Sequence, residues 1–235
     1  MRVYVPADWL VGQREGKSNI AGRIDPRRFF RGAESIVSPS VEHTVVSVVG
    51  QRPHDVNFVA ALLTELGVDM GANSQKKKPQ NLHRLSHEAP GLHHLCSRLV
   101  LEPEFILQQS FAERVSHLKG WAWKRGHETS SKDTLIGGMN RNLCFLWDEM
   151  EAAWSGHLCI VALRPVSHDQ TTDPRRISAI EDIKSYTSDR KLHLDLSQLE
   201  QNSKRHIQQL SSFLGLTLTK PQFDKAVALS VSGAS

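Results

Sequence analysis

The stretch VVSVVGQRPHDVNFVAALLTELGVDMG, residues 45–71, constrains the fold more than any other part of this chain. A run of β-branched residues over 44–49 predicts a buried strand that ends at Gly50. A short polar loop, 51–55, separates this strand from apolar residues at helical spacing over 56–67. The pattern therefore predicts a strand, a loop and a helix in the order that binds phosphate in many α/β proteins.

The rest of the chain alternates further apolar strands with helices. We predict strands over 157–165 and 191–196, helices over 142–154, from 174 onward and over 197–215, and one or two helices over 91–123 with a break near Pro103. This alternation predicts the α/β class, with a parallel sheet covered by helices on both faces. We assign 44–235 to one such domain, and 1–43, which has little periodicity, to an irregular N-terminal extension.

Composition restricts the classes of function. Among 235 residues, 39% are hydrophobic and 23% are charged, which is typical of a globular protein. Lys and Arg number 29 against 25 Asp and Glu, and the formal charge of +4 suits an anionic ligand. Lys76, Lys77 and Lys78 are adjacent, yet no nucleic-acid-binding module is recognisable, so a nucleic acid is not the expected partner. With no apolar run of membrane-spanning length and no secretion signal, we expect a cytoplasmic protein without a membrane span.

The cysteines and histidines do not predict a metal site. Cys96, Cys144 and Cys159 form no CxxC arrangement and have apolar neighbours, so we expect each of them to pack as a small hydrophobic side chain. His93 and His94 lie near Cys96, but the sequence offers no second cluster of ligands. We therefore expect no bound metal.

The residues that follow the first two apolar strands carry the candidate binding chemistry. Ligands of parallel α/β sheets bind beyond the carboxyl ends of the strands, where the N-termini of helices present N–H groups. The first helix would offer such donors from about Asp55 onward, and the strand over 157–165 brings Arg164 to the same edge. The chain lacks GxxxxGK[ST] and GxGxxG, so a P-loop NTPase and a dinucleotide-binding fold are both disfavoured.

Four blocks of the chain follow one another in the order and spacing of a known family. They are the stretch quoted above, GGMNRNLCFLWDEM, HLCIVALRPV and LHLDLSQLEQNSKRHIQQLSSFLGL, and together they cover most of 44–216. These blocks resemble the sulfotransferases, especially their bacterial branch. The resemblance implies a P-loop-like, three-layer fold and the transfer of sulfuryl from 3′-phosphoadenosine 5′-phosphosulfate (PAPS) to a hydroxyl or an amine.

The resemblance also implies which residues bind the donor. Arg164 and Thr172 match the Arg and the Ser that hold the 3′-phosphate in the family, although one residue is missing after Arg164 and Thr171 competes with Thr172. Arg141 takes the place of the Arg in the second block. Arg175 and Arg176 lie nearby in the sequence and would add positive charge.

The first loop, which holds the 5′-phosphosulfate in the family, differs from the family's PRSGTS. The loop residues that we predict to contact the donor are Arg52, His54, Asp55, Val56 and Asn57, and Pro53 stands among them. Pro53 supplies no N–H, the carboxylate of Asp55 repels a phosphate, and Val56 lacks a hydroxyl. We expect Arg52 or His54 to compensate in part for these changes, and Asp55 or Asn57 to cap the helix.

A general base is expected after the first helix. The segment NLHRLSHEAPGLHH carries Glu88 at the acidic position of the family, with His83 and His87 beside it. Carboxylate and imidazole groups can remove the proton of the acceptor as sulfuryl arrives. The candidate catalytic residues are Glu88, His87 and, from the first loop, His54.

Two hypotheses about function follow. The first is a PAPS-dependent sulfotransferase that acts on a small-molecule or carbohydrate acceptor. The second is an inactive member of the same fold that serves as a binding or assembly subunit, with a protein partner or a second copy engaged through the basic segment 22–32. A weaker third hypothesis is that the altered loop accepts a different anionic ligand.

Overall fold

The β-branched run after residue 44 forms β1, Val45–Gly50, a strand whose residues are all buried. β1 pairs in parallel with β4, Ile136–Met139, along one edge and with β5, Leu158–Leu163, along the other. β6, Lys191–Asp195, follows beyond β5, so the order in the sheet is β4-β1-β5-β6. The predicted parallel sheet is confirmed.

The structure is a computed structural model that describes residues 43–71, 91–129, 135–164 and 173–232. These residues belong to one unit, 41–235. The N-terminal extension proposed from the sequence lies almost entirely outside the described residues, so the division of the chain near residue 44 stays a prediction.

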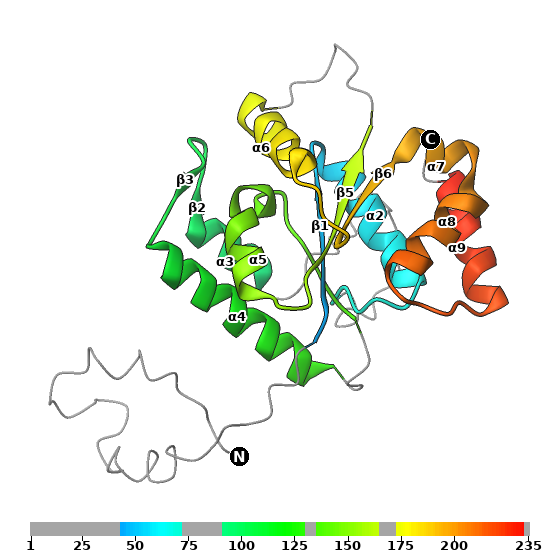
Figure 1. Cartoon of the computed structure of the whole chain (residues 1–235), viewed down its shortest axis with the longest axis horizontal. Coiled ribbons are helices and arrows are strands. Elements are labelled where there is room, and N and C mark those ends of the chain that lie inside the picture. The colour runs from blue at the N-terminus through cyan, green and yellow to red at the C-terminus, as the bar shows by residue number, and fades with distance from the viewer. Residues whose placement is uncertain (1–42, 72–90, 130–134, 165–172, 233–235) are drawn as a thin grey trace, which may run out of the picture. The chain divides into compact units, whose positions relative to one another are not determined.

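Helices cover both faces of the sheet and make three layers (Figure 1). Along β1, Val45 and Val49 face one core cluster while Val46 and Val48 face the other, as the two-residue period of a strand requires. The first cluster is covered by α3, Leu92–Leu99, α4, Phe111–Glu128, α5, Trp147–Ala153, and α6, Pro174–Ser185. The second is covered by α2, Pro53–Glu65, α7, Leu196–Gln201, α8, Ser203–Phe213, and α9, Lys220–Ser232.

The first helix begins earlier than its apolar spacing predicts. α2 starts at Pro53 rather than at residue 56, because proline is favoured in the first turn, where its missing N–H costs nothing. Its C-cap is Leu66, and Gly67 follows with a φ of 97°, the left-handed conformation that glycine adopts readily at this place.

The segment predicted as one or two helices contains two, separated by a hairpin. The strands β2, Val100–Leu101, and β3, Ile106–Leu107, pair antiparallel between α3 and α4. Two residues per strand are too few to show an alternating pattern in the sequence. The predicted break near Pro103 thus lies in the turn of a hairpin.

Other departures from the sequence prediction have local causes. The helix predicted over 197–215 is two helices, α7 and α8, which meet at Asn202, a residue type that often leaves the helical conformation. The helix predicted over 142–154 begins with a 3-10 turn, η5, Leu143–Leu146. β4 was not predicted, because two of its four residues are glycine, and neither was α9, which packs against α2 and α8.

All three cysteines are buried and free, as expected. Burial raises the pKa of the Cys144 and Cys159 thiols to about 12. These thiols therefore stay protonated and pack as hydrophobic groups.

We expect Gly50→Ala to destabilise the fold by about 1–3 kcal/mol, because overpacking separates close elements. A Cβ on Gly50 would lie 3.0 Å from Val56 Cγ2 and 3.1 Å from the carbonyl oxygen of Ala162. Gly120→Ala is the matched control. Gly120 lies on an exposed part of α4, and an added Cβ would have nothing within 4 Å. This substitution should leave the free energy of unfolding unchanged or raise it by up to about 1 kcal/mol. Urea unfolding measures both, and equal stability of the two variants would contradict the close contact at Gly50.

Candidate functional site

The carboxyl ends of the strands lie level with one another. Gly50 of β1 pairs with Ala162 of β5, and Leu163 pairs with Asp195, the last residue of β6. β1 and β6 are followed by helices on one face of the sheet, while β4 and β5 are followed by helices on the other (Figure 1). In α/β proteins, ligands bind beyond the carboxyl ends of neighbouring strands whose connections leave on opposite faces, so this end of the sheet is the candidate site.

The N-terminus of α2 reaches this edge directly after β1. Arg52 is the N-cap residue, and within the described part of the chain no side chain caps the helix there, so the predicted cap by Asp55 or Asn57 is wrong. Pro53 occupies the first turn and has no N–H to offer, and the N–H of Val56 already donates to the carbonyl of Arg52. Of the first-turn residues, His54 and Asp55 carry backbone N–H groups, the kind of donor that binds anions at the N-terminus of a helix.

The side chains of the first loop face different surroundings. Val56 is buried in the core beneath the loop, and His54 is exposed. Asn57 is half-buried, and its Oδ1 has no hydrogen-bond partner in the part of the chain that the structure describes. Val56 thus supports the loop, while His54 and Asn57 carry its polar groups.

Arg164 and Asp55, both predicted to lie at the donor site, contact each other. Arg164 Nε donates to Asp55 Oδ1 at 3.2 Å, and Arg164 Nη2 donates to Glu200 Oε1, from α7, at 2.7 Å. The Asp55 side chain is 5% exposed, against 24% for Arg164 and 25% for Glu200. Burial by itself would lower the pKa of the Arg164 guanidinium, but the hydrogen bond to Glu200 and the charge of Asp55 raise it. Arg164 is therefore a fixed cation with two acidic partners.

Arg141 lies at the same edge, two residues beyond the end of β4. Its Nη2 donates to Glu102 Oε2 at 2.5 Å, and Asn142 Nδ2 donates to Glu102 Oε1 at 2.7 Å. Burial would raise the pKa of Glu102, but the hydrogen bond from Asn142 and the charge of Arg141 lower it below its ordinary value of 4.5. The Glu102 carboxylate thus joins the β2–β3 hairpin to the end of β4.

The two arginines of α6 hold the same hairpin. Arg176 is buried and donates to the Arg141 carbonyl and to Asn142 Oδ1, while Arg175 donates to the carbonyl of Pro103. Both guanidinium groups lie within 6 Å of the ring centroid of Phe105, a distance at which cations are attracted to aromatic faces. The positive charge that the sequence places near Arg164 is therefore used, at Arg175 and Arg176, to fix the hairpin.

Three predicted site residues lie outside the described residues. They are the candidate bases Glu88 and His87 and the candidate 3′-phosphate ligand Thr172. Thr171 and His83, the alternatives weighed beside them, lie outside as well. Their roles stay predictions.

Sequence reasoning missed both acids at this edge. Glu102 and Glu200 carry no motif, and each meets its arginine from 36 to 39 residues away in sequence. An excess of basic residues at one edge of a sheet implies that acids compensate it, but the sequence does not say which ones do. Only the packing of the hairpin and of α7 identifies these two residues.

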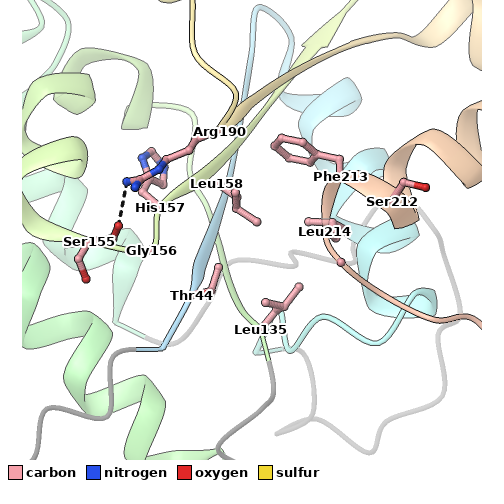
Figure 2. Close-up of a pocket in the computed structure, with 11 residues that line it drawn as sticks. Thr44, Leu135, Ser155, Gly156, His157, Leu158, Arg190, Ser212, Phe213 and Leu214 are labelled. Carbon is pink, nitrogen blue, oxygen red and sulfur yellow. Dashed lines mark hydrogen bonds between the residues drawn. The ribbon is translucent and has the colours of Figure 1, made fainter.

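A cavity lined by described residues lies at the amino ends of the strands, opposite the candidate site (Figure 2). It measures about 350 Å³, and its lining includes Thr44, Leu135, Leu158, Arg190, Phe213 and Leu214. The residues next to the amino ends of the four strands line it, and Arg190 Nη1 donates to the carbonyl of Ser155 (Figure 2). The lining of the cavity mixes polar and apolar side chains, and the cavity does not coincide with the predicted site.

A chain of polar side chains runs from this cavity into the sheet. His157 Nε2 lies 2.7 Å from Ser47 Oγ, and His157 Nδ1 lies 2.5 Å from Glu151 Oε1. The order of groups is that of a Ser–His–acid triad, in which the serine must be reachable by substrate. Ser47 is fully buried in the middle of β1, so the chain satisfies buried polar atoms instead of presenting a nucleophile.

The described residues give no indication of a membrane or metal protein. Among them, none of the helices is long and apolar enough to cross a membrane. In the same residues, His, Cys, Asp and Glu side chains do not gather in groups of three or more that could hold a metal ion.

Comparison with known proteins finds likeness only among solved structures. No family model matches the chain, and none of the curated proteins does. Among solved structures, the chain is similar to sulfotransferase STF1 from Mycobacterium tuberculosis H37Rv, with 13% identity and a TM-score of 0.45 over 79% of this chain and 71% of that one. With this identity and TM-score, the likeness says nothing about the activity of this chain.

We expect Glu102→Gln to lower the melting temperature at neutral pH. The pKa of Glu102 is lowered in the folded state, so its ion pair contributes stability above about pH 4.5, and this contribution is lost as the pH falls through the folded-state pKa. Since the side chain is 33% exposed, the effect is about 0.5–1 kcal/mol. Thermal unfolding measured from pH 7 to pH 3 should show that the difference in melting temperature between the variant and the wild type decreases as the pH falls. Glu181→Gln, which removes the acid of an exposed ion pair on α6, is the control. A difference in melting temperature between Glu102→Gln and wild type that persists at pH 3 would contradict the stabilising role of the ionised Glu102 carboxylate.

Proposed function

We propose that this chain binds PAPS at the carboxyl edge of the sheet and transfers its sulfuryl group to a hydroxyl or amine of a small-molecule or carbohydrate acceptor. The observation that carries the proposal is the contact between Arg164 and the first turn of α2, two segments that lie 109 residues apart in sequence. These are the segments in which the sequence predicts the 3′-phosphate and 5′-phosphosulfate contacts. A cytoplasmic location is part of the proposal.

The residues of this edge can supply what sulfuryl transfer needs. In-line transfer of sulfuryl from the phosphate oxygen of the donor to the oxygen or nitrogen of the acceptor depends mainly on the position of the two reactants and on positive charge around the transferred group. Arg164 offers a guanidinium fork that suits a phosphate, and the first-turn amides of α2 offer backbone donors to the second anionic group. His54, exposed at the same turn, and Glu88 or His87 are the proposed bases that take the proton of the acceptor.

The runner-up function is a binding or assembly subunit that does not catalyse transfer. Two observations favour it: Pro53 removes one amide from the first turn, and Arg164 is already paired with Asp55 and Glu200. Each lost charge-assisted hydrogen bond to a phosphate costs about 1.5–3 kcal/mol of binding free energy. The affinity for the nucleotide therefore separates the two functions.

We expect the wild-type protein to bind 3′-phosphoadenosine 5′-phosphate, the nucleotide product of PAPS, in a calorimetric titration. Arg164→Ala should weaken this binding by about tenfold to a hundredfold, because a charge-assisted contact to phosphate is lost. Arg190→Ala is the matched control: it removes a guanidinium at the opposite edge of the sheet and should leave the affinity unchanged.

The fold of each variant is checked by circular dichroism, since Arg164→Ala leaves Asp55 without this partner. Arg164→Lys keeps the positive charge but loses the two-pronged guanidinium group. Its affinity for the nucleotide should therefore lie between that of the alanine variant and that of the wild type. An absence of binding by the wild type at millimolar nucleotide would overturn the PAPS proposal. An equal loss of affinity in Arg190→Ala would place the nucleotide at the other edge.

A further inference from the structure

Arg164 is held between two carboxylates, one on each side of its guanidinium. The Nε edge donates to Asp55 and the Nη2 atom donates to Glu200. With all three groups ionised, one positive charge faces two negative charges, so the cluster is an acidic one. A phosphate cannot bind beside two carboxylates without strong repulsion, and one of them must leave before an anionic ligand binds.

The two carboxylates differ in how easily they can leave. Asp55 is the third residue of α2, with a side chain 5% exposed, and it lies at the positive end of the helix dipole. Glu200 is the second-to-last residue of the short helix α7, where the dipole disfavours an anion, and its side chain is 25% exposed. Rotation of Glu200 into solvent therefore costs less than release of Asp55.

We propose that Glu200 occupies the place on Arg164 that a phosphate group of the ligand takes, and that it rotates away when the ligand binds. The inference depends on the proposed function, because the ligand is the nucleotide of that site. Asp55 stays on the Nε edge and orients the guanidinium, while the Nη edge turns from Glu200 to the phosphate. Glu200 is then a specificity-determining residue.

The specificity follows from competition within the chain. Glu200 is tethered close to Arg164, so its effective concentration there is high, and a single anion such as inorganic phosphate competes with it poorly. A nucleotide that carries two phosphate groups makes further contacts with the first turn of α2. These contacts offset the displacement of Glu200, so the site selects a ligand with two separated anionic groups.

The test is a calorimetric titration of 3′-phosphoadenosine 5′-phosphate and, separately, of inorganic phosphate into the full-length wild type, Glu200→Gln and Glu200→Ala. Glu200→Gln removes the charge and keeps the shape, and we expect it to bind the nucleotide at least about tenfold more tightly. Glu200→Ala also removes the competing acceptor and should bind at least as tightly as Glu200→Gln. Inorganic phosphate should bind the two variants measurably and the wild type far more weakly.

Glu65→Gln is the matched control. The Glu65 side chain is 27% exposed and pairs with Lys225, so it resembles Glu200 in exposure and in having one cation as a partner. It is the last residue of α2, about 18 Å along the helix from Pro53 at a rise of about 1.5 Å per residue. Its nucleotide affinity should equal that of the wild type, which separates a local effect of Glu200 from a change in net charge.

The outcomes separate the inference from the proposed function. Nucleotide binding by the wild type that is unchanged or weaker in both Glu200 variants would overturn the inference and leave the proposed function in place. No binding by any protein would overturn both. A lower melting temperature without tighter binding would show that Glu200 is only structural, which also overturns the inference. Binding by the Glu200 variants alone would show that the nucleotide does not displace Glu200 in the wild type, which overturns both the inference and the proposed function.

Discussion

The parallel pairing of β1 along both of its edges is the constraint on which the rest of the structure depends. Because β4 and β5 both bond to β1 in register, the strand ends that carry Arg141 and Arg164 lie on either side of Gly50. Because Gly50 has no side chain, Val56 of α2 and Ala162 of β5 can both lie close to its backbone. This packing fixes the start of α2 against the sheet. The position of the candidate site thus follows from packing beneath the loop and not from the chemistry of the loop itself.

Charge balance is the second organising factor at this edge. A guanidinium that loses part of its water needs acceptors, and here the chain supplies them: Glu200 and Asp55 for Arg164, and Glu102 for Arg141. Both arginines come from segments that motif reasoning marks as basic, whereas Glu102 and Glu200 come from segments that it leaves unmarked. A count of basic motif residues therefore overstates the positive potential available to a ligand.

The sequence predicts the elements whose pattern is local and long enough to be recognised. β1 and β5 are uninterrupted apolar runs, so their burial and their place in a parallel sheet were predictable. β4 is short and half glycine, and its glycines are needed because Met70 and Trp121 fill the space that a side chain would take. No local pattern reports such a tertiary requirement.

The candidate site also has features that the sequence predicts and features that it does not. Arg164 and the start of α2 were predictable because each follows an apolar strand, and parallel strands end at a common edge. The pairing of Arg164 with Glu200 was not predictable, because Glu200 lies 36 residues away in α7 and no motif marks it as a partner of Arg164. Long-range ion pairs of this kind are properties of the packed chain and not of any one segment.

Asp55 explains how the N-terminus of α2 and Arg164 can lie next to each other. A helix N-terminus and a nearby arginine repel each other unless an anion lies between them. In this chain the Asp55 carboxylate lies in the first turn of α2 and accepts a hydrogen bond from Arg164, so it supplies that anion from within. Asp55 therefore stabilises this arrangement of α2 and Arg164. Under the proposed function, the negative charge of Asp55 also opposes an anionic ligand, which must be offset by the other contacts of that ligand.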